Sequence, residues 1–304
     1  MRATARGRWL SIPLIIAIAG CGGSDSVEQP ANGSDPAELI ARVPPDFQLG
    51  YVNLAGAREQ LDMASDTDPS AREAKPDSDE AELAGVAAVA LHFMLIPEPT
   101  ALAEEVVDWG AVSEAASNRI FGVPGITVIR TTQPFDQIAQ ELEERGFERD
   151  GDVVELDRGF VNQDHAVFAD AGEGIVVLGW TRQAVDRALS ETPAADPLQL
   201  SLLTSVEGVS RNAFTGGLPE CVRGVATGQS FDPELGEIRI EVKGRADEKR
   251  LRDPEPTLDL FQLEDLSAEG NTLTAELSRG KESVVQHPDP ASWLAGTRQF
   301  YDCG

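Results

Sequence analysis

The spacing of apolar residues along the chain predicts a series of short strands and helices that begins near residue 36. Apolar residues on alternate positions are typical of a strand with one buried face, and apolar residues three or four positions apart are typical of one helix face. This pattern predicts strands at 47–54, 126–131, 153–156, 165–169 and 175–178. It predicts helices at 36–40, 55–63, 83–96 and 198–204, and further helices after the N-caps Thr100, Thr132 and Thr181.

The segment 125–190 carries the clearest local signals. The helix after Thr132 is expected to end at Gly146, because glycine adopts the left-handed conformation that closes many helices. Residues 165–169 and 175–178 are expected to pair as a hairpin. The resulting order, strand-helix-strand-strand-strand-helix, favours an α+β fold of mostly antiparallel sheets with helices packed on one side. A doubly wound nucleotide-binding sheet would need strict alternation of strands and helices, which this order lacks.

The C-terminal part is predicted to contain strands and a closing helix. Alternation predicts strands at 221–226 and 237–242, a hairpin of 260–263 with 272–277, and a helix at 291–301. With a soft boundary at the Gly216-Gly217 turn, we expect two α+β subdomains, at 37–205 and 211–304. Their similar content would allow an ancient duplication, although no aligned repeat can be drawn.

Residues 1–20 have the pattern of an export signal. Arg2, Arg6 and Arg8 precede an apolar run from Leu10 to Ala19, and small residues follow. The run is about ten residues long, whereas a bilayer span needs roughly 20, so a permanent transmembrane anchor is disfavoured. This segment is therefore expected to be removed.

The residues Ile18-Ala19-Gly20-Cys21 resemble the lipobox of bacterial lipoproteins. The resemblance implies cleavage before Cys21, a diacylglyceryl thioether on that cysteine and acylation of its amino group. Several acyl chains hold a protein stably on a membrane where one would not. Residues 21–36, rich in turn formers, are predicted to be a flexible tether. The protein is thus placed on the extracytoplasmic face of the cell membrane, and Gly22 would permit outer-membrane sorting in an organism that has one.

The body itself is similar to a loose set of uncharacterised actinobacterial lipoproteins. The similar features are Val43-Pro44-Pro45-Asp46 before a strand, the helix end Glu144-Arg145-Gly146-Phe147, and Leu178 to Val185 after the hairpin. The resemblance implies no activity, and no functional residue is carried over from it.

Acidic side chains dominate the charge of the chain. The formal net charge is −27, and loss of the three signal arginines makes it −30. Such a surface repels nucleic acid and anionic lipid, so we expect no nucleic-acid partner. The segment 64–80 concentrates acidic residues and proline and is predicted to be a mobile, exposed loop. A calcium site within it is the alternative, but the glycine and the terminal glutamate of an EF-hand loop are missing.

Catalytic motifs are absent from the sequence. It has no nucleophile elbow, zinc-protease helix, dinucleotide fingerprint or phosphate-binding loop. The histidines are His92, His165 and His287, and the adjacent pair Asp164-His165 would point to opposite faces of a strand. A carboxylate pair for glycoside hydrolysis could form from the many acidic residues, but large aromatic residues that bind sugars are scarce. We predict no enzymatic activity, no metal and no cofactor.

Two cysteines remain once Cys21 carries lipid, and we predict that Cys221 and Cys303 form a disulfide. An export signal delivers a chain to a compartment where disulfides persist. The alternative is two buried free thiols, because two cysteines cannot complete a structural zinc site.

Together these features favour a membrane-anchored interaction or envelope-maintenance protein that is not catalytic. Its expected partners are the membrane, through the lipid on Cys21, and an envelope protein. A solute-binding lipoprotein of a transport system is the alternative function, although that class usually has repeated strand-helix units in two lobes around a cleft. An envelope hydrolase that uses carboxylates is the third.

Overall fold

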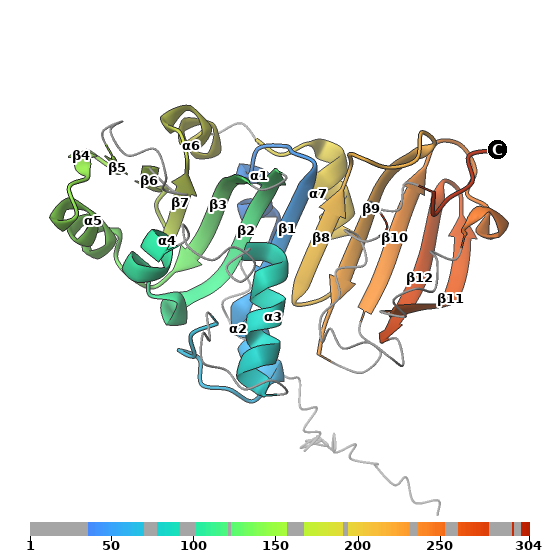
Figure 1. Cartoon of the computed structure of the whole chain (residues 1–304), viewed down its shortest axis with the longest axis horizontal. Coiled ribbons are helices and arrows are strands. Elements are labelled where there is room, and N and C mark those ends of the chain that lie inside the picture. The colour runs from blue at the N-terminus through green and yellow to red at the C-terminus, as the bar shows by residue number, and fades with distance from the viewer. Residues whose placement is uncertain are drawn as a thin grey trace, which may run out of the picture. The chain divides into compact units, whose positions relative to one another are not determined.

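A twelve-stranded antiparallel sheet is formed by the residues described in the computed structural model, in the order β11-β12-β10-β9-β8-β1-β2-β3-β7-β6-β5-β4 (Figure 1). The described residues are 36–69, 78–91, 101–120, 123–156, 167–190, 194–231, 236–252, 261–279, 294 and 299–304. The strands are β1 (Gln48–Asn53), β2 (Val112–Ile120), β3 (Val123–Thr131), β4 (Glu148–Asp150), β5 (Val153–Glu155), β6 (Val167–Asp170), β7 (Ile175–Gly179), β8 (Ser210–Phe214), β9 (Val222–Gln229), β10 (Gly236–Val242), β11 (Phe261–Glu269) and β12 (Thr272–Arg279). The helices are α1 (Pro36–Arg42), α2 (Leu54–Gln60), α3 (Asp79–Leu91), α4 (Ala101–Val106), α5 (Phe135–Glu144), α6 (Arg182–Leu189) and α7 (Pro197–Thr204), with short 3₁₀ turns η1 (Trp109–Ala111) and η2 (Glu248–Arg250).

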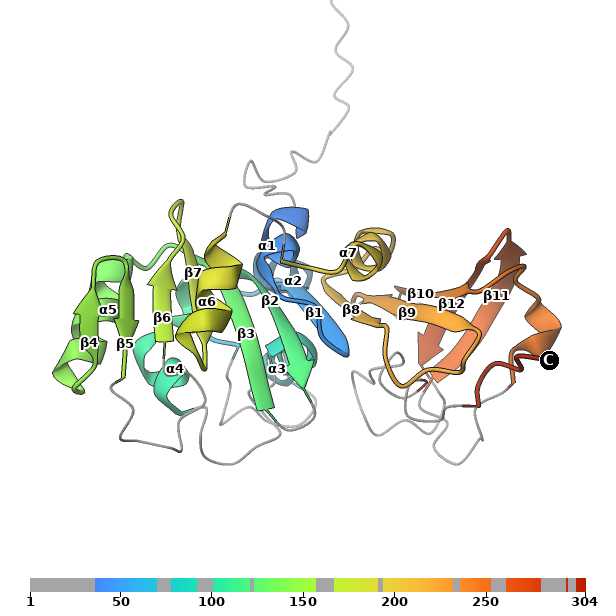
Figure 2. The same ribbon diagram turned by 90° about the horizontal axis from the view of Figure 1, so that it is seen from above.

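The α+β class and the antiparallel sheet are confirmed, but the helices pack on both faces rather than on one. In β1, Leu49 and Tyr51 join a core with helices α1, α6 and α7, whereas Val52 joins a core with α2, α3, α4 and α5. Figure 2 shows α1 and α7 on one side of the sheet and α3 on the other. The reason lies in strands such as β7, which is buried along its whole length and therefore needs cover on both faces.

The sheet continues across the predicted subdomain boundary, which lies between residue 205 and the Gly216-Gly217 turn. Strand β8 pairs with β1 on one side and with β9 on the other. Residues 35–304 accordingly form one compact unit. The ranges 37–205 and 211–304 therefore contribute to one sheet.

Strand β2 was not predicted from the sequence, although it lies at the centre of the sheet between β1 and β3. Its first residues, Val112-Ser113-Glu114-Ala115-Ala116-Ser117-Asn118, include few large apolar side chains. Alanine buries little area, so the strand pattern is faint in the sequence. Pairing on both edges nevertheless leaves Glu114, Ser117 and Asn118 buried.

The local signals around α5 and α6 are largely confirmed. Gly146 has a φ of +92°, and Phe147 N donates to Leu142 O over 3.1 Å, which closes α5 as expected. Thr181 Oγ1 accepts from Ala184 N over 3.2 Å and caps α6. Thr132 does not cap α5, because the helix begins at Phe135 after Pro134, whose carbonyl accepts from the first turn.

The predicted closing helix does not extend to residue 301. Within the described part of the segment 291–304, Leu294 is helical, but residues 299–304 are not. Tyr301 instead forms a β-bridge with Leu251. The C-terminal residues are therefore held by backbone pairing and by a disulfide between Cys303 and Cys221.

Candidate functional site

A row of charged and polar side chains crosses four adjacent strands on the face that α1 covers. Arg211 of β8 lies directly opposite Tyr51 of β1, and Glu114 of β2 lies directly opposite Arg130 of β3. Tyr51 Oη donates to Glu114 Oε1 over 2.7 Å, and Arg130 Nε donates to Glu114 Oε2 over 3.1 Å. The Arg211 guanidinium sits 5.7 Å from the centre of the Tyr51 ring. With Glu38, these residues form what we term the charge row.

Glu38 attaches helix α1 to this row. Arg130 Nη2 donates to Glu38 Oε2 over 2.7 Å, and Arg42 lies 3.8 Å from the other Glu38 oxygen, one helical turn along α1. The neighbouring α1 residues Leu39 and Ile40 are fully buried. Because α1 is the first element after the predicted tether, the charge row and these side chains fix the start of the folded body.

The electrostatics of the row favour a structural role. Burial, followed by the nearby Glu114 carboxylate, raises the pKa of Tyr51 far above its usual value. Burial lowers the pKa of Arg130, but its hydrogen bonds to Glu38 and Glu114 outweigh that effect and raise it. Tyr51 thus stays neutral and the arginine stays charged, and each carboxylate already has a guanidinium partner. The row can bind elements together, but its paired groups do not offer a poised acid, base or nucleophile.

A second polar centre surrounds Arg58 of α2, whose side chain is buried. Its guanidinium donates to the carbonyls of Thr67 (2.9 Å), Val112 (2.7 Å) and Trp109 (2.8 Å). Burial lowers the pKa of Arg58, and the nearby carboxylate of Asp68 opposes this shift. Arg58 therefore ties α2 to β2 and to the chain after α2.

These contacts also involve the start of the acidic segment 64–80, which is predicted to be a mobile, exposed loop. Thr67 O accepts from Arg58, and a Cβ at Gly110 would lie 2.4 Å from Asp66 O, while residues 64–66 and 68 are exposed. The segment's last residues begin α3 at Asp79, whereas 70–77 lie outside the described residues. Among the residues that the structure describes, no group of three or more histidine, cysteine or acidic side chains could hold a metal ion.

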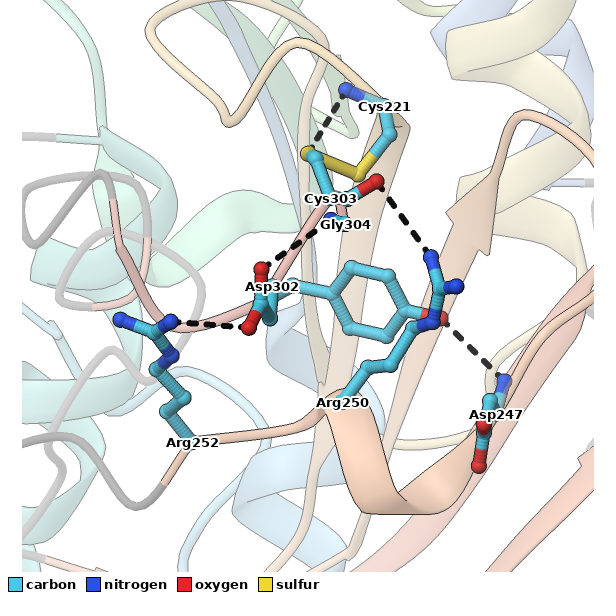
Figure 3. The surroundings of a disulfide bond; sticks show 8 residues. Cys221, Asp247, Arg250, Arg252, Asp302, Cys303 and Gly304 are labelled. Carbon is cyan, nitrogen blue, oxygen red and sulfur yellow. Dashed lines mark hydrogen bonds and ion pairs between the residues drawn. A yellow bond between two sulfur atoms is a disulfide. The ribbon is translucent and has the colours of Figure 1, made fainter.

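The predicted disulfide joins the start of β9 to the C-terminus (Figure 3). Cys221 and Cys303 are bonded, with their Cα atoms 5.5 Å apart, and they are 82 positions apart in sequence. Cys303 is exposed and Cys221 is half-buried. The bond closes a loop that includes β9, β10, β11 and β12.

Polar contacts reinforce the disulfide. Arg252 N donates to Phe300 O over 2.7 Å, and Asp302 N donates to Arg250 O over 2.8 Å. Phe300 and Tyr301 are buried in the core of the C-terminal strands. The Gly304 N–H, followed by the Arg252 guanidinium 2.9 Å away, holds the pKa of Asp302 below its usual value. We call residues 299–304 with the disulfide the C-terminal clip.

The predicted site residues divide into two groups. The structure brings Cys221 and Cys303 together, whereas Cys21, the pair Asp164-His165, and His92 and His287 lie outside the described residues. The charge row was missed, because Glu114 belongs to the unpredicted strand. The signal that the sequence offered for this site was Glu114, a glutamate that stands between the small residues Ser113 and Ala115. Within the described residues, no helix combines the length and apolar character needed to cross a membrane.

Comparisons with known proteins give limited information. No family model and no curated protein matches the chain. Crystal form I of the protein TP0453 is similar, with a TM-score of 0.44 and 11% identity over 88% of this chain and 99% of that chain. Crystal form III of TP0453 gives a TM-score of 0.42 and 10% identity over 86% and 98% of the two chains. Similarity at this level does not identify a function.

Proposed function

We propose that this protein is a membrane-anchored extracytoplasmic lipoprotein with its lipid on Cys21, and that its body acts as a non-catalytic interaction or envelope-maintenance module. The observation that carries the proposal is the Cys221–Cys303 disulfide. The chain has three cysteines, so this bond pairs all of them except the one in the lipobox. Disulfides form and persist in oxidising compartments outside the cytoplasm, which agrees with export.

The attachment of α1 also supports this proposal. A protein held by its N-terminus transmits any pull on the anchor through the first folded element. In this chain that element is α1, which is fixed by Glu38 through the charge row and by the buried Leu39 and Ile40. An anchored body benefits from such fastening, because fraying at its first helix would otherwise begin where the tether joins it.

The solute-binding alternative receives less support from the fold. Two-lobed solute receptors are built from repeated strand-helix units with parallel strands. Each strand pair of the described sheet is antiparallel instead. The charge row does not favour the hydrolase alternative, because its carboxylates Glu38 and Glu114 are already paired with arginine.

A crosslinking experiment in the native envelope tests the interaction role. A photoreactive amino acid replaces Trp180, which is 38% exposed, or Glu276, which is exposed on β12. We expect the anchored protein to give discrete adducts with envelope proteins, and the matched Cys21→Ser form of each variant to lose them. If neither site gives an adduct, and the purified body is stabilised saturably by one solute from a panel of amino acids, sugars and peptides, the interaction role is wrong and solute binding replaces it.

A further inference from the structure

A group of uncharged polar side chains interrupts the apolar packing on the sheet face that α3 covers. Asn212 of β8 lies directly opposite Thr227 of β9, and Ser210 lies directly opposite Gln229. Residues that face each other in antiparallel strands lie on the same side of the sheet. All four are buried, with exposed fractions between 0% and 6%. We term Ser210, Asn212, Thr227 and Gln229 the polar cluster.

The polar cluster separates two apolar cores. On one side, Ser210 lies opposite Val52 of β1, which belongs to the core under α2, α3, α4 and α5. On the other side, Thr227 lies opposite Ile238 of β10, which belongs to the core of the C-terminal strands. Apolar residues such as valine or alanine at these four positions would have made the two cores continuous and would have left no polar group to bury.

Within the part of the chain that the structure describes, two hydroxyls of this cluster have no hydrogen-bond partner. They are Ser210 Oγ and Thr227 Oγ1, which belong to side chains 1% and 0% exposed. A buried hydroxyl without a partner is destabilising, and the buried polar groups of folded proteins nearly always bond to protein or to ordered water. Ser210 and Thr227 are diagonal neighbours on adjacent strands, so their Cβ atoms are about 6–7 Å apart. Two hydrogen bonds of about 2.8 Å to one shared oxygen span such a gap.

We infer that a single water molecule is bound between β8 and β9, where it bridges Ser210 Oγ and Thr227 Oγ1. Buried waters usually make about three hydrogen bonds, and the amides of Asn212 and Gln229 border the pair on the same face. The water satisfies both hydroxyls and acts as a structural ligand that joins the central strands to the C-terminal strands. This inference is independent of the proposed function.

A double-mutant cycle with Ser210→Ala and Thr227→Val tests this water site, because the two hydroxyls form no hydrogen bond with each other. Both substitutions remove the hydroxyl and keep nearly the same shape. If one water serves both hydroxyls, each single variant unfolds more readily, by roughly five- to tenfold in the unfolding equilibrium constant. The double variant should then be no less stable than the less stable of the two single variants. The effects of the two substitutions on the unfolding equilibrium constant would therefore fall short of additivity by about fivefold, although the two hydroxyls are not bonded to each other. As a control, Thr227→Val should combine additively with Ser278→Ala on β12.

The opposite result has a clear signature. If the hydroxyls are unsatisfied and no water is present, both substitutions should stabilise the protein and their effects should add, which would overturn the inference. Nuclear magnetic resonance of the unaltered protein gives a second test that needs no variant. Magnetisation transfer from a long-lived water to the Thr227 methyl and hydroxyl is expected, and the absence of this transfer would overturn the inference. A crystal structure with density for a larger solute between these two side chains would also overturn it.

Discussion

The central strands and the C-terminal strands of this sheet are stabilised in different ways. Strand β7 is buried throughout, and helices cover both of its faces. In β10 buried and partly exposed residues alternate, and β11 has no fully buried residue. Strand β9 is still buried at nearly every position, but β10 and the strands beyond it leave one face at least partly exposed. The C-terminal strands are stabilised by the C-terminal clip, which combines a covalent bond with several polar contacts. The central strands are stabilised by the helices packed on them. The comparison indicates that the clip compensates for a thinner core.

The largest effect is expected from Arg58→Met in the helix-covered part. The substitution leaves the carbonyls of Thr67, Val112 and Trp109 without their buried donor. We expect a loss of about 3–5 kcal/mol in the free energy of unfolding, measured by denaturant titration. Arg149→Met, which removes an ion pair with Asp136 and a contact with the Phe135 ring at the surface, serves as the control and should have a much smaller effect than Arg58→Met. Equal losses in the two variants would show that the buried Arg58 contacts contribute little.

The next effect concerns the clip itself. Replacing both Cys221 and Cys303 with serine should lower the free energy of unfolding by about 2–4 kcal/mol, because the unfolded chain regains the freedom of the closed loop. Amide exchange should accelerate at Tyr301 and in β10 and β12, with little change in β7. Reductant should lower the melting temperature of the unaltered protein and leave that of the double variant unchanged. A melting temperature insensitive to reductant in both proteins would contradict the compensating role of the clip.

A smaller effect is expected from Glu114→Gln in the charge row. The variant keeps the size of the side chain but removes the charge that faces Arg130 and accepts from Tyr51. We expect a loss of about 1–3 kcal/mol and faster amide exchange in α1 at Leu39 and Ile40. The matched variant is Glu241→Gln in β10, whose partner Arg223 is exposed, and it should cost less than about 1 kcal/mol. A loss from Glu241→Gln as large as that from Glu114→Gln would remove the distinction between the two regions.

The smallest effect concerns acid. The pKa of Asp302 is lowered in the folded protein, so its contribution to stability is present above its unfolded pKa of about 4 and is lost as the pH falls through the folded value. Asp46 has the opposite sign, because burial raises its pKa, and its protonated form is favoured by folding. The protection factors of the Phe300 and Tyr301 amides, which are corrected for the intrinsic pH dependence of exchange, should therefore fall below pH 4, and Asp302→Asn should remove that dependence. An unchanged pH profile in Asp302→Asn would assign the acid response to other groups.

Features set by neighbouring residues were predictable from the sequence. The closure of α5 at Gly146, the Thr181 cap and the hairpin of β6 with β7 depend on short-range chemistry, and all three are confirmed. The cysteine pair followed from counting residues after the lipobox cysteine was set aside. The antiparallel α+β class followed from the order of the strands and helices.

Features set by distant pairing were not predictable. Strand β2 has too little apolar area to show an alternation pattern, yet the strands on each side bury it. The charge row depends on the register that brings Tyr51 beside Glu114, 63 positions away in sequence. The cover on both faces of the sheet depends on which strands become central, and the sequence pattern alone does not determine that choice.

Mass spectrometry of the first peptide of the membrane-associated protein tests the proposed anchor most directly. The account predicts a peptide that begins at Cys21 and carries the mass of a diacylglyceryl group and an acyl chain, while Cys221 and Cys303 are recovered in one disulfide-linked pair. A peptide that begins at Met1, or at any other residue without lipid mass, would contradict the lipoprotein proposal.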